Sequence, residues 1–257
     1  MNVLVTGGTG ALGREVVIDL RSSGHRARVM SRKPGSGGDW VQANLATGAG
    51  LDRAVADMDA IIHAGTAARQ PWRLNATDVK GTRRLLEAAK RAHVKHVVFI
   101  SIVGIERVDY AYYRYKLAAE RVLREDIVPW SIVRATQFHT LMEVFLGGFA
   151  RLPRVAMVPL EWKFQPVDPR DVAARVTDVS IGPPAGMLPD FGGPEVRTFE
   201  GLAQSWLKAR KLNKRLVDLR LPLRFSRQFA EGRLLTPEHK DGKITFEQYL
   251  VRRYGRW

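Results

Sequence analysis

The feature that most constrains this chain is a glycine-rich turn close to its first residue. Gly7, Gly10 and Gly13 lie between an apolar, β-branched run, 2–6, and a segment with helical spacing, 11–22. The first glycine permits a tight turn out of a strand, the second lets a ligand approach the backbone, and the third lets the helix pack close to the sheet. The pattern predicts a βα unit that binds a dinucleotide; the alternative is a tight turn that binds nothing.

The start of the predicted helix carries the chemistry of this turn. Free N–H groups and a partial positive charge at a helix N-terminus attract phosphate oxygens. We therefore expect the diphosphate of a nicotinamide dinucleotide to contact this part of the chain. The predicted contacts are Thr6, Gly7, Thr9, Gly10, Ala11, Leu12 and Gly13.

The end of the second predicted strand, 26–30, distinguishes NAD from NADP. NAD-binding proteins usually carry Asp or Glu there, to hold the ribose 2′-OH. This chain carries Ser31, Arg32 and Lys33, and the two cations can form charge-assisted hydrogen bonds with a 2′-phosphate. The sequence therefore favours NADP(H) over NAD(H). The alternative is that Arg32 and Lys33 are ordinary loop charges of a basic protein.

The order of predicted elements indicates the fold class. Strands alternate strictly with helices up to Ala135, which predicts βαβ units, a mostly parallel sheet and an α/β fold of the Rossmann-type, doubly wound class. We expect the dinucleotide-binding core over 1–135, and over 136–257 a smaller mixed α/β substrate lobe that extends the sheet and does not fold independently. The expected strands are 2–6, 26–30, 40–43, 59–63, 96–101, 130–134, 154–158 and 164–167, and the expected helices are 11–22, 51–56, 75–92, 110–124, 136–149, 169–179 and 199–209.

Composition excludes several classes of protein. The 257 residues, 45% of them hydrophobic, are enough for one large core. The chain has no cysteine, which rules out disulfides, thiolate metal sites and a cysteine nucleophile, and its six histidines have no metal-ligand spacing. No apolar run approaches the roughly 18 residues of a membrane span, and Met1 leads directly into a strand without a signal peptide. We therefore expect a cytoplasmic protein without a metal or a membrane partner.

The positive charge is concentrated near the C-terminal end. The net charge is +15, and residues 201–257 contribute +9 of it, from fourteen Lys or Arg and five Asp or Glu. Such a run usually marks a solvated helical face. Contact with nucleic acid is the alternative, but no DNA-binding motif accompanies the charge.

Several stretches carry a resemblance to a known family. The chain resembles the atypical short-chain dehydrogenase/reductases, specifically their NmrA-like NAD(P)-binding branch, over essentially its whole length. The resemblance implies a Rossmann core, a C-terminal substrate lobe and cofactor contacts from Arg32, from the end of the fourth strand and from Lys116 at the nicotinamide ribose. The stretches are Val5–Gly13, Asp78–Thr82, Leu85–Ala89, His96–Gly104, Tyr112–Glu120, Trp130–His139, Gln165–Asp168 and Asp171–Ala173, and the contacts after the fourth strand are Ala64, Gly65 and Thr66.

One departure from the family lies at the predicted adenine site. The family often has an acid before the leucine that ends the third strand. This chain has Asn44 before Leu45, and an amide can still form a hydrogen bond with adenine. We therefore keep both residues as predicted cofactor contacts.

The residue types of a reductase follow in the expected order. In active short-chain dehydrogenases a Tyr exchanges the proton, a Lys lowers the Tyr pKa and holds the ribose, and a Ser orients the carbonyl. Tyr112 and Lys116 have the i, i+4 spacing of one helix face, and Ser101 ends a parallel strand. Two readings stay open, because only 11 positions separate the Ser from the Tyr and because neighbouring tyrosines make helix packing an alternative role. The chain is either an NADP(H)-dependent oxidoreductase of a small carbonyl or quinone-like substrate, or a non-catalytic NADP(H)-binding redox sensor.

Four residues are candidates for the substrate pocket, because they follow the fourth and sixth strands. They are Trp72, Gln137, Phe138 and His139. Core packing is the alternative for Trp72 and Phe138, and a satisfied polar position at a helix start is the alternative for His139. We expect a small-molecule substrate and a monomer or homodimer.

Overall fold

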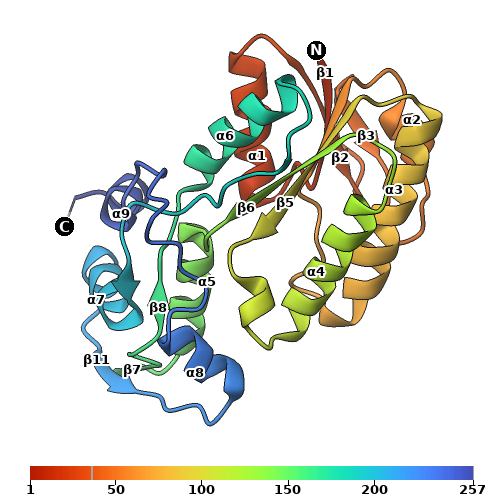
Figure 1. Ribbon diagram of the computed structural model, residues 1–257. Coiled ribbons are helices and arrows are strands. Elements are labelled where there is room, and N and C mark those ends of the chain that lie inside the picture. The colour runs from red at the N-terminus through yellow and green to blue at the C-terminus, as the bar shows by residue number, and fades with distance from the viewer. Residues whose placement is uncertain (36, 257) are drawn as a thin grey trace. The chain divides into compact units, whose positions relative to one another are not determined.

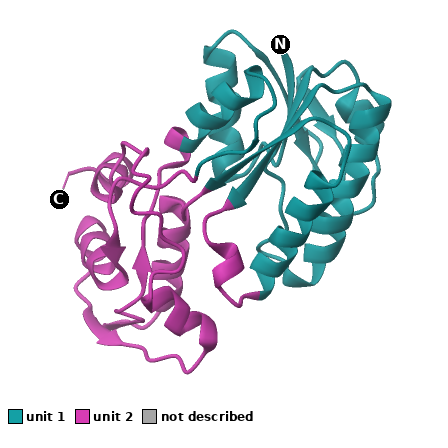
Figure 2. Cartoon of the chain, viewed as in Figure 1, with its two compact units in different colours: residues 1–101, 111–134, 172–189 teal, residues 102–110, 135–171, 190–257 magenta. Residues whose placement is uncertain are grey.

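The computed structural model describes residues 1–35 and 37–256 and divides the chain into two compact units (Figure 2). Unit 1 comprises 1–101, 111–134 and 172–189, and unit 2 comprises 102–110, 135–171 and 190–257. Ser36 and Trp257 lie outside the described residues. The predicted division into a core over 1–135 and a lobe over 136–257 stays a prediction.

Unit 1 is built around a seven-stranded sheet with the strand order β3-β2-β1-β4-β5-β6-β9. The pairs of β1 with β2 and β4, β2 with β3, β4 with β5, and β6 with β9 are parallel. Helices α1 and α6 cover one face, and α2, α3 and α4 cover the other (Figure 1). The predicted Rossmann-type fold is confirmed. The elements are β1 Asn2–Thr6, α1 Ala11–Ser22, β2 Arg26–Ser31, β3 Trp40–Gln42, α2 Leu51–Val55, β4 Ala60–His63, α3 Lys80–Arg91, β5 His96–Ile102, α4 Ala111–Arg124, β6 Trp130–Ala135, α6 Pro169–Ile181 and β9 Gly186–Met187.

The apolar runs of the sequence become the buried sheet. Leu4, Ile61 and Phe99, on three neighbouring strands, are all within 1% of complete burial. Strands covered by helices on both faces have continuous apolar sequences instead of alternating ones, which explains why β1, β4 and β5 are visible in the sequence. The core therefore lies on both faces of the sheet and holds the carboxyl ends of its strands in place.

The helix predicted over 75–92 is divided in the structure. A π-helical turn, η2 Asn75–Val79, precedes α3. Within it the main-chain oxygen of Asp78 accepts a hydrogen bond from the Thr82 hydroxyl at 2.5 Å. No proline or glycine signals this turn, so the periodicity of the sequence predicted one continuous helix.

Unit 2 combines an aromatic core with short strands. Trp162 stacks on Phe199 at an interplanar angle of 18° and meets Phe229 edge-on, with the ring centroids 4.9 Å apart. Strands β7 and β11 pair in parallel, and β8 and β10 pair antiparallel. The elements are α5 His139–Phe149, β7 Val155–Val158, β8 Lys163–Phe164, β10 Arg197–Thr198, α7 Phe199–Ala209, β11 Arg215–Asp218, α8 Arg224–Ala230 and α9 Phe246–Tyr254.

Two predictions for this unit were wrong in detail. The helix expected over 136–149 begins at His139, because residues 136–138 are extended and exchange main-chain hydrogen bonds with Phe191 and Val167. The strand expected over 164–167 is limited to β8. In both places contacts distant in sequence override the local pattern.

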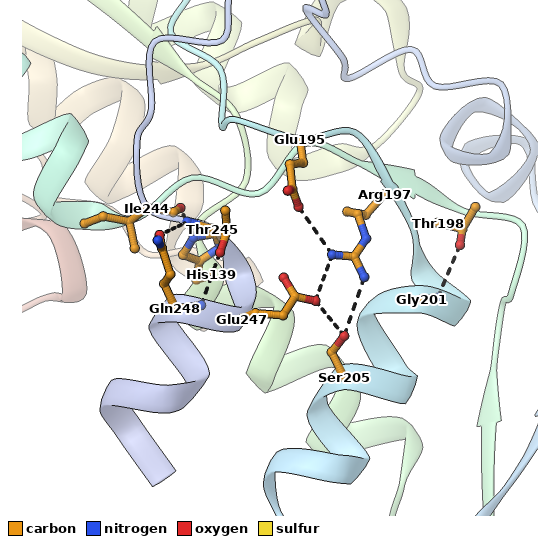
Figure 3. Close-up of polar contacts among 10 residues, drawn as sticks. All are labelled: His139, Glu195, Arg197, Thr198, Gly201, Ser205, Ile244, Thr245, Glu247 and Gln248. Atoms are coloured by element: carbon orange, nitrogen blue, oxygen red, sulfur yellow. Dashed lines mark hydrogen bonds and ion pairs between the residues drawn. The ribbon is translucent and has the colours of Figure 1, made fainter. Parts of the chain in front are cut away.

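A polar cluster attaches the C-terminal helix α9 to α7 (Figure 3). Arg197 Nη1 lies 2.8 Å from Glu247 Oε1, and the Ser205 hydroxyl donates to the same oxygen at 2.6 Å. Thr245 and Gln248 form a capping box at the start of α9. The helix is thus held at its first turn by an ion pair and by its own cap.

We expect Glu247→Gln to lower the melting temperature at pH 7 by a few degrees. Burial raises the pKa of Glu247, but the hydrogen bonds from Ser205 and Arg197 outweigh it and hold the pKa below the ordinary 4.5. A depressed carboxyl pKa contributes stability above the unfolded-state pKa, and this stability is lost as the pH falls through the folded-state pKa. The difference between wild type and variant, measured by thermal unfolding, should therefore shrink below about pH 4.5. The exposed Glu200 on α7 supplies the control, because Glu200→Gln should change little.

Two features are absent from residues 1–35 and 37–256. No helix there is long and apolar enough to cross a lipid bilayer. No group of three or more His, Asp or Glu side chains there is arranged to hold a metal ion.

Candidate cofactor and active site

A pocket of about 290 Å³ opens at the carboxyl edge of the unit 1 sheet. It lies where β1 is flanked by β2 and β4, the point at which the strand order reverses and at which open α/β sheets bind ligands. Eleven of the predicted cofactor contacts line it: Gly7, Thr9, Gly10, Ser31, Arg32, Lys33, Asn44, Leu45, Ala64, Gly65 and Thr66. The pocket thus brings together predicted contacts from the carboxyl ends of four strands.

The glycines of the turn are required by close backbone contacts. A Cβ on Gly13 would lie 2.2 Å from the Gly7 carbonyl oxygen, and one on Gly7, whose φ is +68°, would lie 2.9 Å from the oxygen of Ala64. Gly10 is the N-cap of α1 and makes no side-chain capping bond. Because glycine has no side chain, nothing at the N-cap accepts the N–H groups of Ala11, Leu12 and Gly13. Helix N-termini with N–H groups in this state commonly bind phosphate.

The cationic residues at the end of β2 line the pocket, and hydrogen bonds hold their backbone in place. The Lys33 amide donates to Ser31 Oγ at 3.1 Å, and Gln42 Nε2 donates to the Arg32 carbonyl oxygen at 3.1 Å. The Arg32 guanidinium makes a long hydrogen bond of 3.5 Å to Gln70 Oε1, and it pairs with no carboxylate among the residues that the structure describes. Its charge is available to an anionic ligand.

Asn44, the predicted adenine contact, uses one of its two amide groups in a hydrogen bond within the protein. Asn44 Oδ1 accepts the Ala46 amide at 3.0 Å. Its Nδ2 group remains a donor that could meet adenine. Asn44 therefore turns the chain after β3 and keeps one hydrogen-bonding group for a ligand.

Thr6 lies behind the pocket and not on its wall. Its hydroxyl oxygen accepts the Gly65 amide at 3.1 Å and lies 2.7 Å from His63 Nδ1, and His63 Nε2 lies 3.0 Å from the Thr82 hydroxyl oxygen. Burial, aided by the charge of Lys116, lowers the pKa of His63 to about 3, so the imidazole is neutral. The network joins the ends of β1 and β4 to α3 and holds the glycine turn against the strand beside it.

Lys116 places a cation inside unit 1. The residue is 4% exposed, and its ammonium nitrogen lies 4.1 Å from the centroid of the Phe99 ring. Burial lowers the pKa of Lys116, while the charges of Asp78 and Glu120 raise it. Glu120 is already held by Arg134 through bonds of 3.0 and 2.7 Å. The role of Lys116 at the nicotinamide ribose stays a prediction.

Tyr112 lies one turn before Lys116 on α4 and contacts the loop that follows β4. Its hydroxyl oxygen is 3.4 Å from Thr66 Oγ1. Thr66 is in turn bound to Asp78, with 2.6 Å between Thr66 Oγ1 and Asp78 Oδ1. Ser101, at the end of β5, is 2% exposed, and its hydroxyl has no protein partner. The joint action of Ser101 and Tyr112 on one carbonyl stays a prediction.

The predicted substrate residues have different environments. Trp72 is 78% exposed, so core packing was the wrong alternative for it. Gln137 is buried with neither amide atom bonded, and Phe138 is a half-buried N-cap. His139 is fully buried, with Nε2 2.9 Å from the Ile244 oxygen, and burial lowers its pKa. His139 Nδ1 and both amide atoms of Gln137 are buried without a hydrogen-bond partner, and the roles of both residues in a substrate pocket stay predictions.

Sequence reasoning missed several residues of the site. Met30 and Ala43 precede predicted contacts on the same strand ends, so the strand pattern could have supplied them. Thr77, Asp78 and His63 carried no such signal, because the π-helical turn and the buried network place them. Ala67 also lines the pocket, while Ala11, Leu12, Gly13 and Lys116 do not belong to its wall.

Comparison with known proteins identifies the family. The NAD(P)H-binding family matches residues 7–141. The (4-alkanoyl-5-oxo-2,5-dihydrofuran-3-yl)methyl phosphate reductase of Streptomyces griseus subsp. griseus is 31% identical over 205 residues, which cover 76% of this chain and 69% of that protein. The chloroplastic divinyl chlorophyllide a 8-vinyl-reductase of Oryza sativa subsp. indica is 28% identical, over 86% of this chain and 61% of that protein. This chain therefore spans less than two thirds of the rice enzyme.

A solved structure has the same fold. A short-chain dehydrogenase/reductase superfamily protein from Agrobacterium tumefaciens, crystallised with NAD, superposes with a TM-score of 0.74 at 22% identity and covers 98% of this chain and 95% of its own. At this identity the likeness concerns the fold. Together with the family match and the pocket at the strand ends, it completes the assignment: the chain belongs to the NAD(P)H-binding family and has a Rossmann-type fold.

Proposed function

We propose that this chain is an NADP(H)-dependent oxidoreductase of the NmrA-like, atypical short-chain dehydrogenase type, which reduces a small carbonyl or quinone-like compound. The observation that carries the proposal is the buried side chain of Lys116 one helical turn after Tyr112, in the unit that holds the pocket. Both relatives named above are reductases, which supports reduction as the direction of the reaction.

Each residue has a defined part in the proposed reaction. A bound dihydronicotinamide would supply a hydride to the carbonyl carbon. The Tyr112 hydroxyl gives its proton to the carbonyl oxygen, so that an alcohol and the oxidised cofactor leave, and the tyrosinate regains a proton from water. Lys116 favours the tyrosinate by its charge. Ser101, with its unbonded hydroxyl, donates a hydrogen bond to the same carbonyl oxygen.

The proposal is tested by binding and turnover together. Calorimetry should detect NADPH binding, and the purified protein should oxidise NADPH with at least one member of a panel of small aldehydes, ketones and quinones. Tight NADPH binding without hydride transfer to any acceptor would favour the non-catalytic sensor. Absence of binding heat with any nicotinamide dinucleotide would reject both functions.

We expect Arg32→Ala to weaken NADP(H) binding about 10- to 100-fold and to leave NAD(H) binding unchanged. The loss corresponds to a charge-assisted hydrogen bond to the 2′-phosphate, about 1.5–3 kcal/mol. Arg26→Ala is the matched control, because Arg26 lies at the opposite end of β2 and pairs with Asp39. Equal affinities of wild type and Arg32→Ala for NADP⁺ would remove Arg32 from cofactor selection.

A further inference from the structure

Two loops of unit 2 that are distant in sequence lie side by side and are strongly basic. One, 150–154, joins α5 to β7, and the other, 210–214, joins α7 to β11. The Lys214 ammonium, on the second loop, donates to the Ala150 carbonyl oxygen, on the first, at 2.9 Å. Neither loop contains an Asp or Glu, so together they form one cationic region.

Three exposed cations of this region have no counter-charge: they are Arg151, Arg154 and Arg215. The first two lie on the loop before β7, and the third begins β11, where its amide donates to the Arg154 carbonyl oxygen at 3.0 Å. No carboxylate in the described part of the chain forms an ion pair with any of them. By contrast, Arg220, beyond the other end of β11, is paired with a carboxylate at 3.1 Å. The charge of the three arginines is therefore available to an anionic partner.

Exposed aliphatic side chains lie among these arginines. Met157 on β7 and Val217 on β11 are register partners in the parallel pair, so their side chains leave the two strands on the same face (Figure 1). They are 37% and 36% exposed, whereas the two neighbours of Met157 in sequence are each 1% exposed and face the core. Arg215 shares the outer face because it precedes Val217 by two residues. Leu152, on the loop before β7, is 50% exposed. We call these three aliphatic residues and the three arginines the basic face.

The chemistry of the basic face favours one kind of partner. Unpaired cations beside exposed aliphatic groups match an anionic bilayer, whose phosphates attract the cations and whose acyl chains cover the aliphatic groups. A nucleic acid also supplies phosphates, but it stacks its bases on aromatic side chains, and the six residues of the face are not aromatic. A second copy of the chain would bring the same positive charge to this face, and like charges repel.

We propose that the basic face docks unit 2 on an anionic lipid surface. The arginines bind headgroup phosphates, while Leu152, Met157 and Val217 enter the boundary between headgroups and acyl chains. Contact of this kind needs no spanning helix, so the proposal replaces the expectation of a chain without a membrane partner, which rested on the absence of a spanning segment. The proposal does not depend on the proposed function, because none of the six residues lines the cofactor pocket.

Vesicle binding tests the proposal directly. The full chain should sediment with vesicles of equimolar phosphatidylglycerol and phosphatidylcholine, and it should stay in solution with vesicles of phosphatidylcholine alone. Because much of the attraction acts between exposed charges, the bound fraction should fall as the NaCl concentration rises. Absence of binding to the anionic vesicles at low salt overturns the proposal.

Two charge-reversal variants of equal net charge locate the contact. Arg154→Glu/Arg215→Glu should lower the partition coefficient at least about 10- to 30-fold, because each arginine near an anionic bilayer contributes about fivefold. The control, Lys95→Glu/Arg124→Glu, reverses two exposed cations of unit 1 and should bind like wild type. All four side chains are exposed, so both variants should unfold at the melting temperature of the wild type within a few degrees. Equal losses of binding in the two variants would show an effect of net charge alone and overturn the assignment to this face.

Leu152→Ser tests the aliphatic part of the face without changing its charge. It should lower binding to the anionic vesicles about threefold or more, because the leucine no longer enters the bilayer boundary. Ile127→Ser, at an aliphatic side chain of unit 1 that is 85% exposed, is the matched control and should bind like wild type. Unchanged vesicle binding in Leu152→Ser would overturn the insertion of the aliphatic side chains. Tighter binding to duplex DNA or to polyglutamate than to the anionic vesicles would assign the face to a soluble polyanion and overturn the lipid partner.

Discussion

Gly13→Ala is expected to abolish measurable binding of nicotinamide dinucleotides and to destabilise the protein by about 1–3 kcal/mol, the usual effect of overpacking. The added Cβ would lie 2.2 Å from the Gly7 oxygen and 2.7 Å from the Gly8 Cα, both of which are backbone atoms that no side-chain rotation can clear. The start of α1 must therefore move away from the turn. Its first N–H groups then no longer point at a common phosphate site. Calorimetry with NADPH and thermal unfolding measure the two effects.

Two other glycines separate binding from stability. Gly148→Ala in α5 has open space around the new Cβ and should slightly stabilise the helix. The new Cβ of Gly10→Ala would meet only the Gly7 oxygen, at 3.1 Å, so this variant should fold nearly normally. It should still weaken cofactor binding, because Gly10 lines the pocket at the predicted phosphate site. Full NADPH affinity in both Gly10→Ala and Gly13→Ala would show that the turn is not the phosphate site.

Tyr112→Phe is expected to reduce kcat about 10²- to 10⁴-fold, the contribution of a positioned general acid. The substitution removes the proton donor and the contact with Thr66, and it keeps the aromatic ring on α4. The dissociation constant of NADPH should remain within about twofold, since a group used only in the chemical step adds little to ground-state binding. Stopped-flow NADPH oxidation with the best acceptor, together with calorimetry, separates the two quantities.

Tyr115→Phe serves as the matched control on the same helix. Tyr115 is half-buried and lies three residues after Tyr112, so an effect of general tyrosine loss on α4 packing would appear in both variants. Equal turnover in wild type and Tyr112→Phe would remove this residue from the mechanism and leave the non-catalytic reading.

The sequence predicted what local patterns encode. Buried parallel strands are continuous apolar runs, and the glycine turn has a spacing that few other structures need, so the sheet and eleven pocket residues could be named in advance. Arg32 and Lys33, predicted as contacts of a 2′-phosphate, line this pocket, and the contact itself stays a prediction. These inferences hold because each depends on a few neighbouring residues.

The remaining features depend on contacts that no local pattern encodes. Asp78 was visible only as part of a family stretch, because its partners Thr66 and Ala67 lie more than ten residues earlier in the chain. The sequence predicted His63 only as the last, polar residue of an apolar strand. Its neutral state follows from burial and from the charge of Lys116, which lies on another element. The late start of α5 has the same origin, since Val167 and Phe191 hold the preceding residues extended.

The order in which the chain emerges during synthesis matters for a sheet made of three separate segments. The last strand, β9, pairs with β6 through Ser131 and Gly186 only after the intervening residues of unit 2 have been made. Until then β6 is an edge strand on that side, and an exposed edge strand can pair with other chains. A protein fragment that stops at Ala135 would leave this edge of β6 permanently unpaired. Grafting the nucleotide-binding half onto another protein therefore requires the whole reading frame through Pro189.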